Sequence, residues 1–215
     1  MALALSVRAG PPAGEGPLKA GSQSIDIALG TSGVAAGYSR GLSRWLELGG
    51  RADWQSWSYQ DTVSLAAFGA RALLRARVTS PESALRVTIE VAPGARRLTS
   101  RVREAGCDCG VDLAPRVALQ SPVSIEVAVP LSTPVLLGAR SELGFDWLPR
   151  AGVVLTPQLA VLAQVPLSDN IGFSVEASAG RLFALSAGTK AALLGSTRGA
   201  VTVPLSLQLG LAIRL

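Results

Sequence analysis

The chain has 215 residues, of which 48% are apolar and 16% are charged, and its formal net charge is +5. This composition excludes a disordered chain, and it leaves few charges to cover the surface of a water-soluble globule. The sequence contains no histidine, which excludes imidazole bases, histidine-ligated metals and Ser-His or Cys-His nucleophiles. The length suits one domain, so we treat residues 1–215 as a single domain.

No stretch of the chain resembles a membrane-spanning helix. The longest uncharged stretch, residues 151–168, is interrupted by Pro157 and Pro166. The first ten residues, MALALSVRAG, lack the basic segment and the long apolar run of a signal peptide. We therefore expect strands rather than helices, and we expect a signal sequence upstream of Met1 if the chain is exported.

Apolar and polar residues alternate along most of the chain, which predicts β-strands. The clearest run is residues 201–215, whose odd positions are aliphatic and whose even positions are mostly small or polar. Most runs are longer than the about 5–6 residues usual in soluble proteins, and they reach the about 9–11 that a tilted membrane-spanning strand needs. We expect ten strands, at residues 2–9, 22–39, 44–57, 62–78, 84–99, 112–130, 134–147, 151–165, 170–187 and 200–215.

Two irregularities stand out in this pattern. Leu65 and Leu73 fall on the otherwise polar face of residues 62–78, and the alternation fades after Gly180. Short connections alternate with longer ones, of which residues 10–21 and 100–111 are the longest. With an even number of strands, this arrangement puts both termini at the short-turn end of a barrel.

Charged residues follow the alternation and gather on the polar face. We expect them to form a charge network inside the barrel, made of Glu47, Arg51, Asp53, Arg71, Arg75, Arg86, Glu90, Arg116, Glu126, Arg140, Glu142 and Asp146. The same face also carries Arg8, Asp26, Arg77, Glu176 and Arg214, so nine arginines face eight carboxylates. This near balance predicts paired guanidinium and carboxylate groups that plug a narrow lumen.

Aromatic residues fall towards the strand ends, as expected for rings at two membrane interfaces. Tyr38 and Trp45 lie near the short-turn end, and Trp54, Trp57, Tyr59, Phe145 and Trp147 lie near the loop end. Phe68 is the exception, because it falls in the middle of its expected strand.

The chain resembles the small outer-membrane β-barrel proteins of Gram-negative bacteria. The resemblance is strongest in YSRGLSRWLELGGRADW (Tyr38–Trp54) and in the closing LSLQLGLAIRL. It implies an all-β, closed, antiparallel, up-and-down transmembrane barrel of about ten strands, with eight or twelve as alternatives. It also implies residence in the bacterial outer membrane, contact with membrane lipid and recognition by the barrel-assembly machinery. Members usually end in an aromatic residue, whereas this chain ends in Leu215.

No residue is assigned to catalysis, and we expect neither enzymatic activity nor a cofactor or a metal. The enzymes of the outer-membrane barrel family that this chain resembles use a catalytic histidine, which this chain lacks. Asp53 and Asp146 form a conceivable carboxylate pair, but ion pairing with Arg51 and Arg140 is the simpler interpretation.

The long loop near residue 107 offers two further features. Cys107 and Cys109 are consistent with a strained local disulfide, an intermolecular disulfide, free thiols or, least of all, a metal site. Arg96, Arg97, Arg101 and Arg103 are equally consistent with contacts to lipopolysaccharide phosphates and with an ordinary solvated loop. No nucleic-acid motif is present.

Three functions remain open. The first is a barrel with a structural or surface-interaction role, and the second is a narrow porin-like channel. The third is a soluble lipocalin-like barrel that binds an apolar ligand. The direction of the aliphatic face separates the first two from the third, because that face points inward in a lipocalin-like barrel and outward in a membrane barrel.

Overall fold

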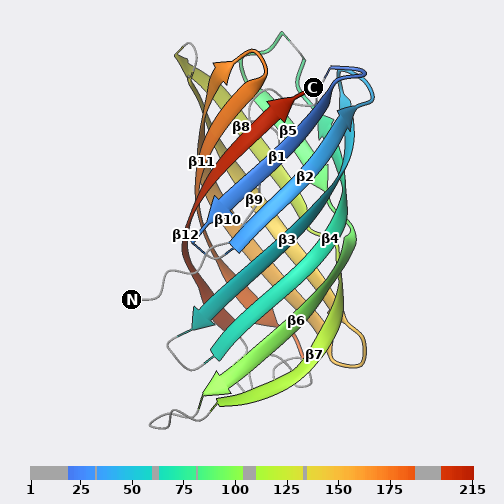
Figure 1. The fold of residues 1–215 in the computed structure, drawn as a ribbon, viewed down its shortest axis with the longest axis vertical. Helices are drawn as coiled ribbons and strands as arrows, with labels where there is room; N and C mark the ends of the chain where they lie inside the picture. Colours follow the sequence, from blue (N-terminus) through green and yellow to red (C-terminus); the bar gives the residue numbers. More distant parts are fainter. Residues whose placement is uncertain are drawn as a thin grey trace.

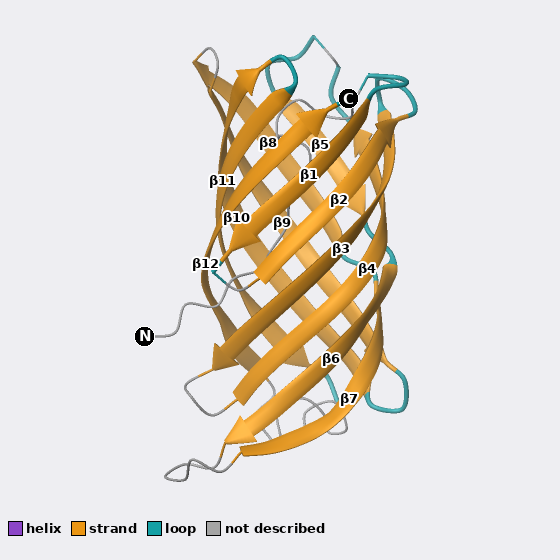
Figure 2. Cartoon of the chain, viewed as in Figure 1, coloured by secondary structure: helices purple, strands orange, loops and turns teal. Residues whose placement is uncertain are grey.

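The computed structural model describes residues 19–31, 33–59, 63–80, 82–103, 110–132, 135–186 and 200–215. These residues form a closed antiparallel barrel of strongly tilted strands (Figure 1 and Figure 2). Within them, no helix has the length and apolar character needed to cross a membrane. The strands are β1 (Gln23–Gly30), β2 (Gly33–Gly41), β3 (Leu46–Tyr59), β4 (Val63–Arg77), β5 (Arg86–Val91), β6 (Gly94–Arg103), β7 (Gly110–Gln120), β8 (Val123–Ser132), β9 (Val135–Leu148), β10 (Gly152–Ser168), β11 (Ile171–Ala184) and β12 (Ala200–Arg214).

The twelve strands of the described chain fill ten positions in the wall. β4 pairs with β5 through residues 74–77 and with β6 through residues 63–71, so β5 and β6 are two parts of one interrupted strand. β7 and β8 divide the next position in the same way. Each break contains a proline, Pro93 or Pro122, which has no amide hydrogen to donate to the ladder. The prediction of a ten-stranded barrel is therefore confirmed.

Consecutive strands are neighbours around the barrel, and β12 pairs with β1 to close it. Arg214 lies opposite Ser24, so the start of β1 and the end of β12 share one end of the barrel. We call this the terminal end; it is the upper end in Figure 1. The opposite end, which we call the loop end, carries the β3–β4, β6–β7, β9–β10 and β11–β12 connections and the short β1–β2 turn.

The expected single strand at residues 22–39 is wrong, because β1 and β2 form a hairpin there. Gly30 lies opposite Gly33 at its tip. A Cβ atom at Gly33 would overlap the Trp54 carbonyl oxygen, so only glycine fits this turn. The outward face passes from odd positions such as Leu29 to even positions such as Val34, and this change of phase marks the turn. The expected strand at residues 2–9 lies outside the described residues.

The wall is apolar on the outside and polar on the inside. Along β12, Leu207 and Leu209 are exposed, with relative exposures of 48% and 52%, whereas Ser206 and Gln208 are buried. The other strands follow the same rule over most of their length: aliphatic side chains cover the outer surface, and most charged side chains point into the lumen. Exposed arginines such as Arg40, Arg97 and Arg101 are exceptions on the outer face. This polarity is the reverse of that in a soluble lipocalin-like barrel.

Candidate functional site: the charged lumen

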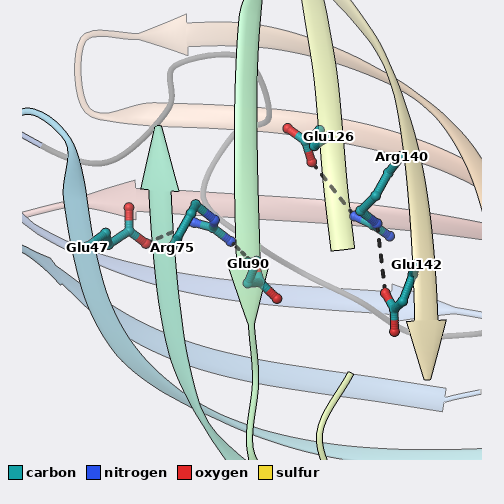
Figure 3. A network of polar contacts seen from close by, with 6 residues as sticks. All are labelled: Glu47, Arg75, Glu90, Glu126, Arg140 and Glu142. Atoms are coloured by element: carbon teal, nitrogen blue, oxygen red, sulfur yellow. Dashed lines mark hydrogen bonds and ion pairs between the residues drawn. The ribbon is translucent and has the colours of Figure 1, made fainter. Parts of the chain in front are cut away.

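Three charged residues form a continuous row across β3, β4 and β5. Glu47 lies directly opposite Arg75, and Arg75 lies directly opposite Glu90. One Arg75 Nη atom lies 2.8 Å from Glu47 Oε1, and the other lies 2.7 Å from Glu90 Oε2 (Figure 3). All three side chains are nearly removed from solvent, which strengthens their attraction. The guanidinium thus ties three neighbouring strands together inside the barrel.

A second row of inward residues crosses β1 to β4, two inward positions closer to the loop end. The row runs from Asp26 over Gly37 and Arg51 to Arg71. A Cβ atom at Gly37 would lie 2.7 Å from both Asp26 carboxylate oxygens, so the glycine leaves the space that the carboxylate occupies. Arg71 reaches diagonally to Asp53, with 3.2 Å between its Nη2 and Asp53 Oδ1.

Arg140 on β9 collects three carboxylates. Its Nη1 lies 3.9 Å from Glu126 Oε2, and its Nε lies 4.0 Å from Glu142 Oε2 (Figure 3). Its Nη2 donates a hydrogen bond to Glu176 on β11, two strands away. Ala160 on the intervening β10 lies opposite Arg140, and its small side chain lets the guanidinium pass over that strand. One guanidinium group therefore contacts three carboxylates.

Arg96 and Asp146 form an ion pair nearer the loop end, between β6 and β9. Gln120 on β7 lies opposite Asp146 and is also buried. Gly69 makes room for this group, because a Cβ atom there would lie 2.8 Å from the Arg96 Cβ. Asp53 and Asp146 thus pair with Arg71 and Arg96, not with Arg51 and Arg140, and they do not form a carboxylate pair with each other.

Beyond Arg96 the inner surface becomes apolar. Eight buried aliphatic side chains pack together at the loop end: Leu65, Ala67, Leu98, Ala118, Leu148, Val154, Leu182 and Ala184. The lumen therefore has a charged middle and an apolar layer at the loop end. Sequence reasoning missed this apolar layer. Its signals in the sequence were Leu65 on the otherwise polar face and the loss of polar alternation after Gly180.

The other predicted residues lie at several different places. Arg116 is exposed near the loop end of β7, and Arg86 is half-buried at the terminal end. The expected basic loop is wrong, because Arg96, Arg97, Arg101 and Arg103 belong to strand β6. Arg97 and Arg101 are exposed on its outer face, whereas Arg96 points inward. Cys107 and Cys109 lie outside the described residues.

Inward charges are unevenly distributed along the lumen. In the described chain, the middle holds eight carboxylates and five arginines, an excess of three carboxylates. They are Asp26, Glu47, Asp53, Glu90, Glu126, Glu142, Asp146 and Glu176, with Arg51, Arg71, Arg75, Arg96 and Arg140. Nearer the terminal end, the inward charged residues are Arg77, Arg86 and Arg214. The nearly balanced total of inward charges therefore hides a net negative charge in the middle of the lumen and a net positive charge at its terminal end.

Within the described residues, no group of three or more metal-ligating side chains is arranged to hold an ion.

No family model and no curated protein matches the chain. Three solved structures align over most of it. OmpT, an outer membrane protein of Vibrio cholerae, has 9% identity and a TM-score of 0.30, with 90% of this chain and 96% of that chain covered. The translocator domain of the autotransporter NalP from Neisseria meningitidis has 10% identity and a TM-score of 0.39, with coverages of 90% and 86%. CarO from Acinetobacter baumannii has 8% identity and a TM-score of 0.25, with coverages of 89% and 96%. At these identities and scores, no property of the three proteins is transferred to this chain.

Proposed function

We propose that the chain is an integral outer-membrane β-barrel whose lumen is closed to ions and which acts through its surface, as a structural or interaction protein. The observation that carries this proposal is the polarity of the wall, with exposed aliphatic side chains outside and charged side chains inside. A closed barrel also satisfies its backbone hydrogen bonds between strands, as a lipid environment requires. A soluble protein would instead expose this large apolar surface to water.

Aromatic side chains support the same interpretation. Tyr38 and Trp45 are exposed near the terminal end, and Trp54 and Trp147 are exposed towards the loop end. Phe68 lies directly opposite Trp54, so the register assigns it to the loop-end group although it falls in the middle of β4. Two aromatic groups separated by an aliphatic band are typical of the two interfaces of a membrane barrel.

Closure of the lumen rests on its contents. A barrel of about eight strands is filled by its own side chains, and ten positions lie near that limit. Ion pairs centred on Arg75 and Arg140 occupy the middle of the lumen along two parts of the wall, β3 to β5 and β8 to β11. The apolar layer that contains Leu65 and Leu148 follows at the loop end. Water and ions would have to cross both levels.

Two measurements test the proposal. Cell fractionation of the exported protein should place it in the outer membrane, and extraction should require detergent. Planar-bilayer recording of the refolded protein should show little or no conductance. Recovery in the soluble fraction contradicts the membrane assignment, and a steady, large, salt-dependent conductance contradicts the closed lumen.

The second candidate is a narrow channel, and the excess of three carboxylates in the middle of the lumen favours cations as its cargo. If a conductance is recorded, the reversal potential in a salt gradient should therefore show cation selectivity. Glu176→Gln should then reduce this selectivity, whereas Glu82→Gln, in the exposed β4–β5 turn, should leave it unchanged. Anion selectivity would contradict this candidate.

A further inference from the structure

Exposed charges of one sign gather at the loop end of the barrel. Among the side chains that the structure describes, the exposed charged groups there are all arginines: Arg97, Arg101, Arg116, Arg150 and Arg181. The exposed carboxylates among these described side chains, Glu82 and Asp169, both lie in turns at the terminal end. The Ser80 hydroxyl donates a hydrogen bond to Glu82 and lowers the pKa of that carboxyl, so the terminal end carries both signs at neutral pH.

Two of these arginines emerge among aromatic side chains on the outer wall. Arg97 lies directly opposite Phe68, and Phe68 lies directly opposite Trp54, so the three form one outward row. The Arg181 guanidinium lies 5.7 Å from the centre of the Phe183 ring. An arginine on the lipid face costs about 2–4 kcal/mol at the bilayer midplane but about 0–1 near an interface. The aromatic neighbours therefore place these arginines at headgroup depth.

The arginines are spread over a broad arc of the loop end. Arg97 and Arg101 are on β6, Arg150 is in the β9–β10 turn, and Arg181 is on β11. β6, β7, β9, β10 and β11 are successive neighbours in the wall at this end. We call these four residues the arginine collar.

We propose that the arginine collar binds phosphate groups of anionic lipid headgroups. A guanidinium group offers paired donors that match phosphate oxygens, and all four members of the collar are arginines. The exposed apolar side chains beside the collar favour a lipid over a free anion as its ligand. Phe68 and Val117, the direct neighbours of Arg97, are 62% and 59% exposed and need acyl chains to cover them. This inference rests on the proposed membrane location.

The test measures which lipid lies beside the collar. The refolded protein is inserted into phosphatidylcholine vesicles that contain brominated phosphatidylglycerol or, in parallel, brominated phosphatidylcholine. Trp54 is kept as the single tryptophan, with Trp45, Trp57 and Trp147 replaced by phenylalanine. The anionic quencher should quench Trp54 more strongly than the zwitterionic one. Arg97 is the collar member in the outward row of Trp54, and each arginine near an anionic surface contributes roughly fivefold. Replacing Arg97, Arg150 and Arg181 by Gln should therefore lower this preference at least about fivefold.

Matched controls make the result specific. Arg40→Gln with Arg44→Gln removes two exposed arginines at the terminal end and should leave the preference at Trp54 unchanged. Inorganic phosphate at the same concentration should not abolish it; if it does, the collar binds free phosphate and the lipid proposal is wrong. An unchanged preference in the collar variant, with strand content retained, also overturns the proposal. Failure of the wild-type protein to float with the vesicles contradicts the membrane function itself and the collar with it.

Discussion

Arg140 offers the sharpest test of the lumen, because one guanidinium stabilises three carboxylates. Its two longer contacts, at 3.9 and 4.0 Å, each correspond to roughly 4 kcal/mol of attraction at an effective dielectric constant of about 20. Burying the charges offsets most of this attraction, so the net value of the cluster is far smaller. Removing only the cation leaves the repulsion uncompensated. Arg140→Met should therefore lower the free energy of unfolding by about 3–5 kcal/mol.

The neighbouring carboxylates predict a contrast within the same cluster. Glu126 makes a longer contact than Glu176, and its side chain is 20% exposed. Replacing it also removes repulsion with the other two carboxylates. Glu126→Gln should therefore change the free energy of unfolding by less than about 1 kcal/mol.

The measurement is a denaturant titration of the barrel in phospholipid vesicles, followed by tryptophan fluorescence. Arg40→Met is the matched control, because Arg40 is exposed on the outer face of β2. The reasoning is refuted if Arg140→Met costs no more than Arg40→Met. It is equally refuted if Glu126→Gln costs as much as Arg140→Met, since the cluster would then depend on each pair rather than on the shared cation.

Two further substitutions test the wall. Leu209→Arg places a charge on the lipid face of β12 and should lower the free energy of unfolding by about 2–4 kcal/mol if it lies near the midplane. Leu215→Arg, beyond the end of β12, should lower it by less than about 1 kcal/mol. Equal losses in vesicle unfolding would contradict the assigned lipid band. Gly33→Ala should destabilise the β1–β2 hairpin by about 1–3 kcal/mol because its Cβ would overlap a carbonyl oxygen. Gly50→Ala, whose Cβ would meet nothing closer than 3.8 Å, should have little effect, and similar melting temperatures for both variants would argue against this turn.

Alternation predicted the fold class and which residues share the aliphatic face, because a strand exposes its two sides at a period of two residues. It failed at residues 22–39, where the chain turns at Gly33 and the alternation resumes in the opposite phase. It also assigned Phe68 to mid-strand, since depth in a tilted barrel depends on the register with β3 and not on position within β4. The register is a long-range property that a local pattern does not contain.

The same limit explains why the charged residues were found but their partners were not. Asp53 and Arg51 share β3, as Asp146 and Arg140 share β9, so proximity in the sequence suggested these pairs. In the barrel, inward side chains meet across strands, and Arg71 and Arg96 supply the cations.

Charge and polarity then vary along the barrel axis in a way that a total count hides. At the loop end the inner surface is apolar around Leu148, and the outer surface carries the arginine collar. At the terminal end the inner surface carries Arg77, Arg86 and Arg214, and between the two ends carboxylates are in excess. Carboxylates are in excess in the middle, and two arginines there are shared: Arg75 binds two carboxylates and Arg140 binds three. Shared cations connect more strands than isolated pairs do, so with carboxylates in excess Arg75 joins β3, β4 and β5, and Arg140 joins β8, β9 and β11.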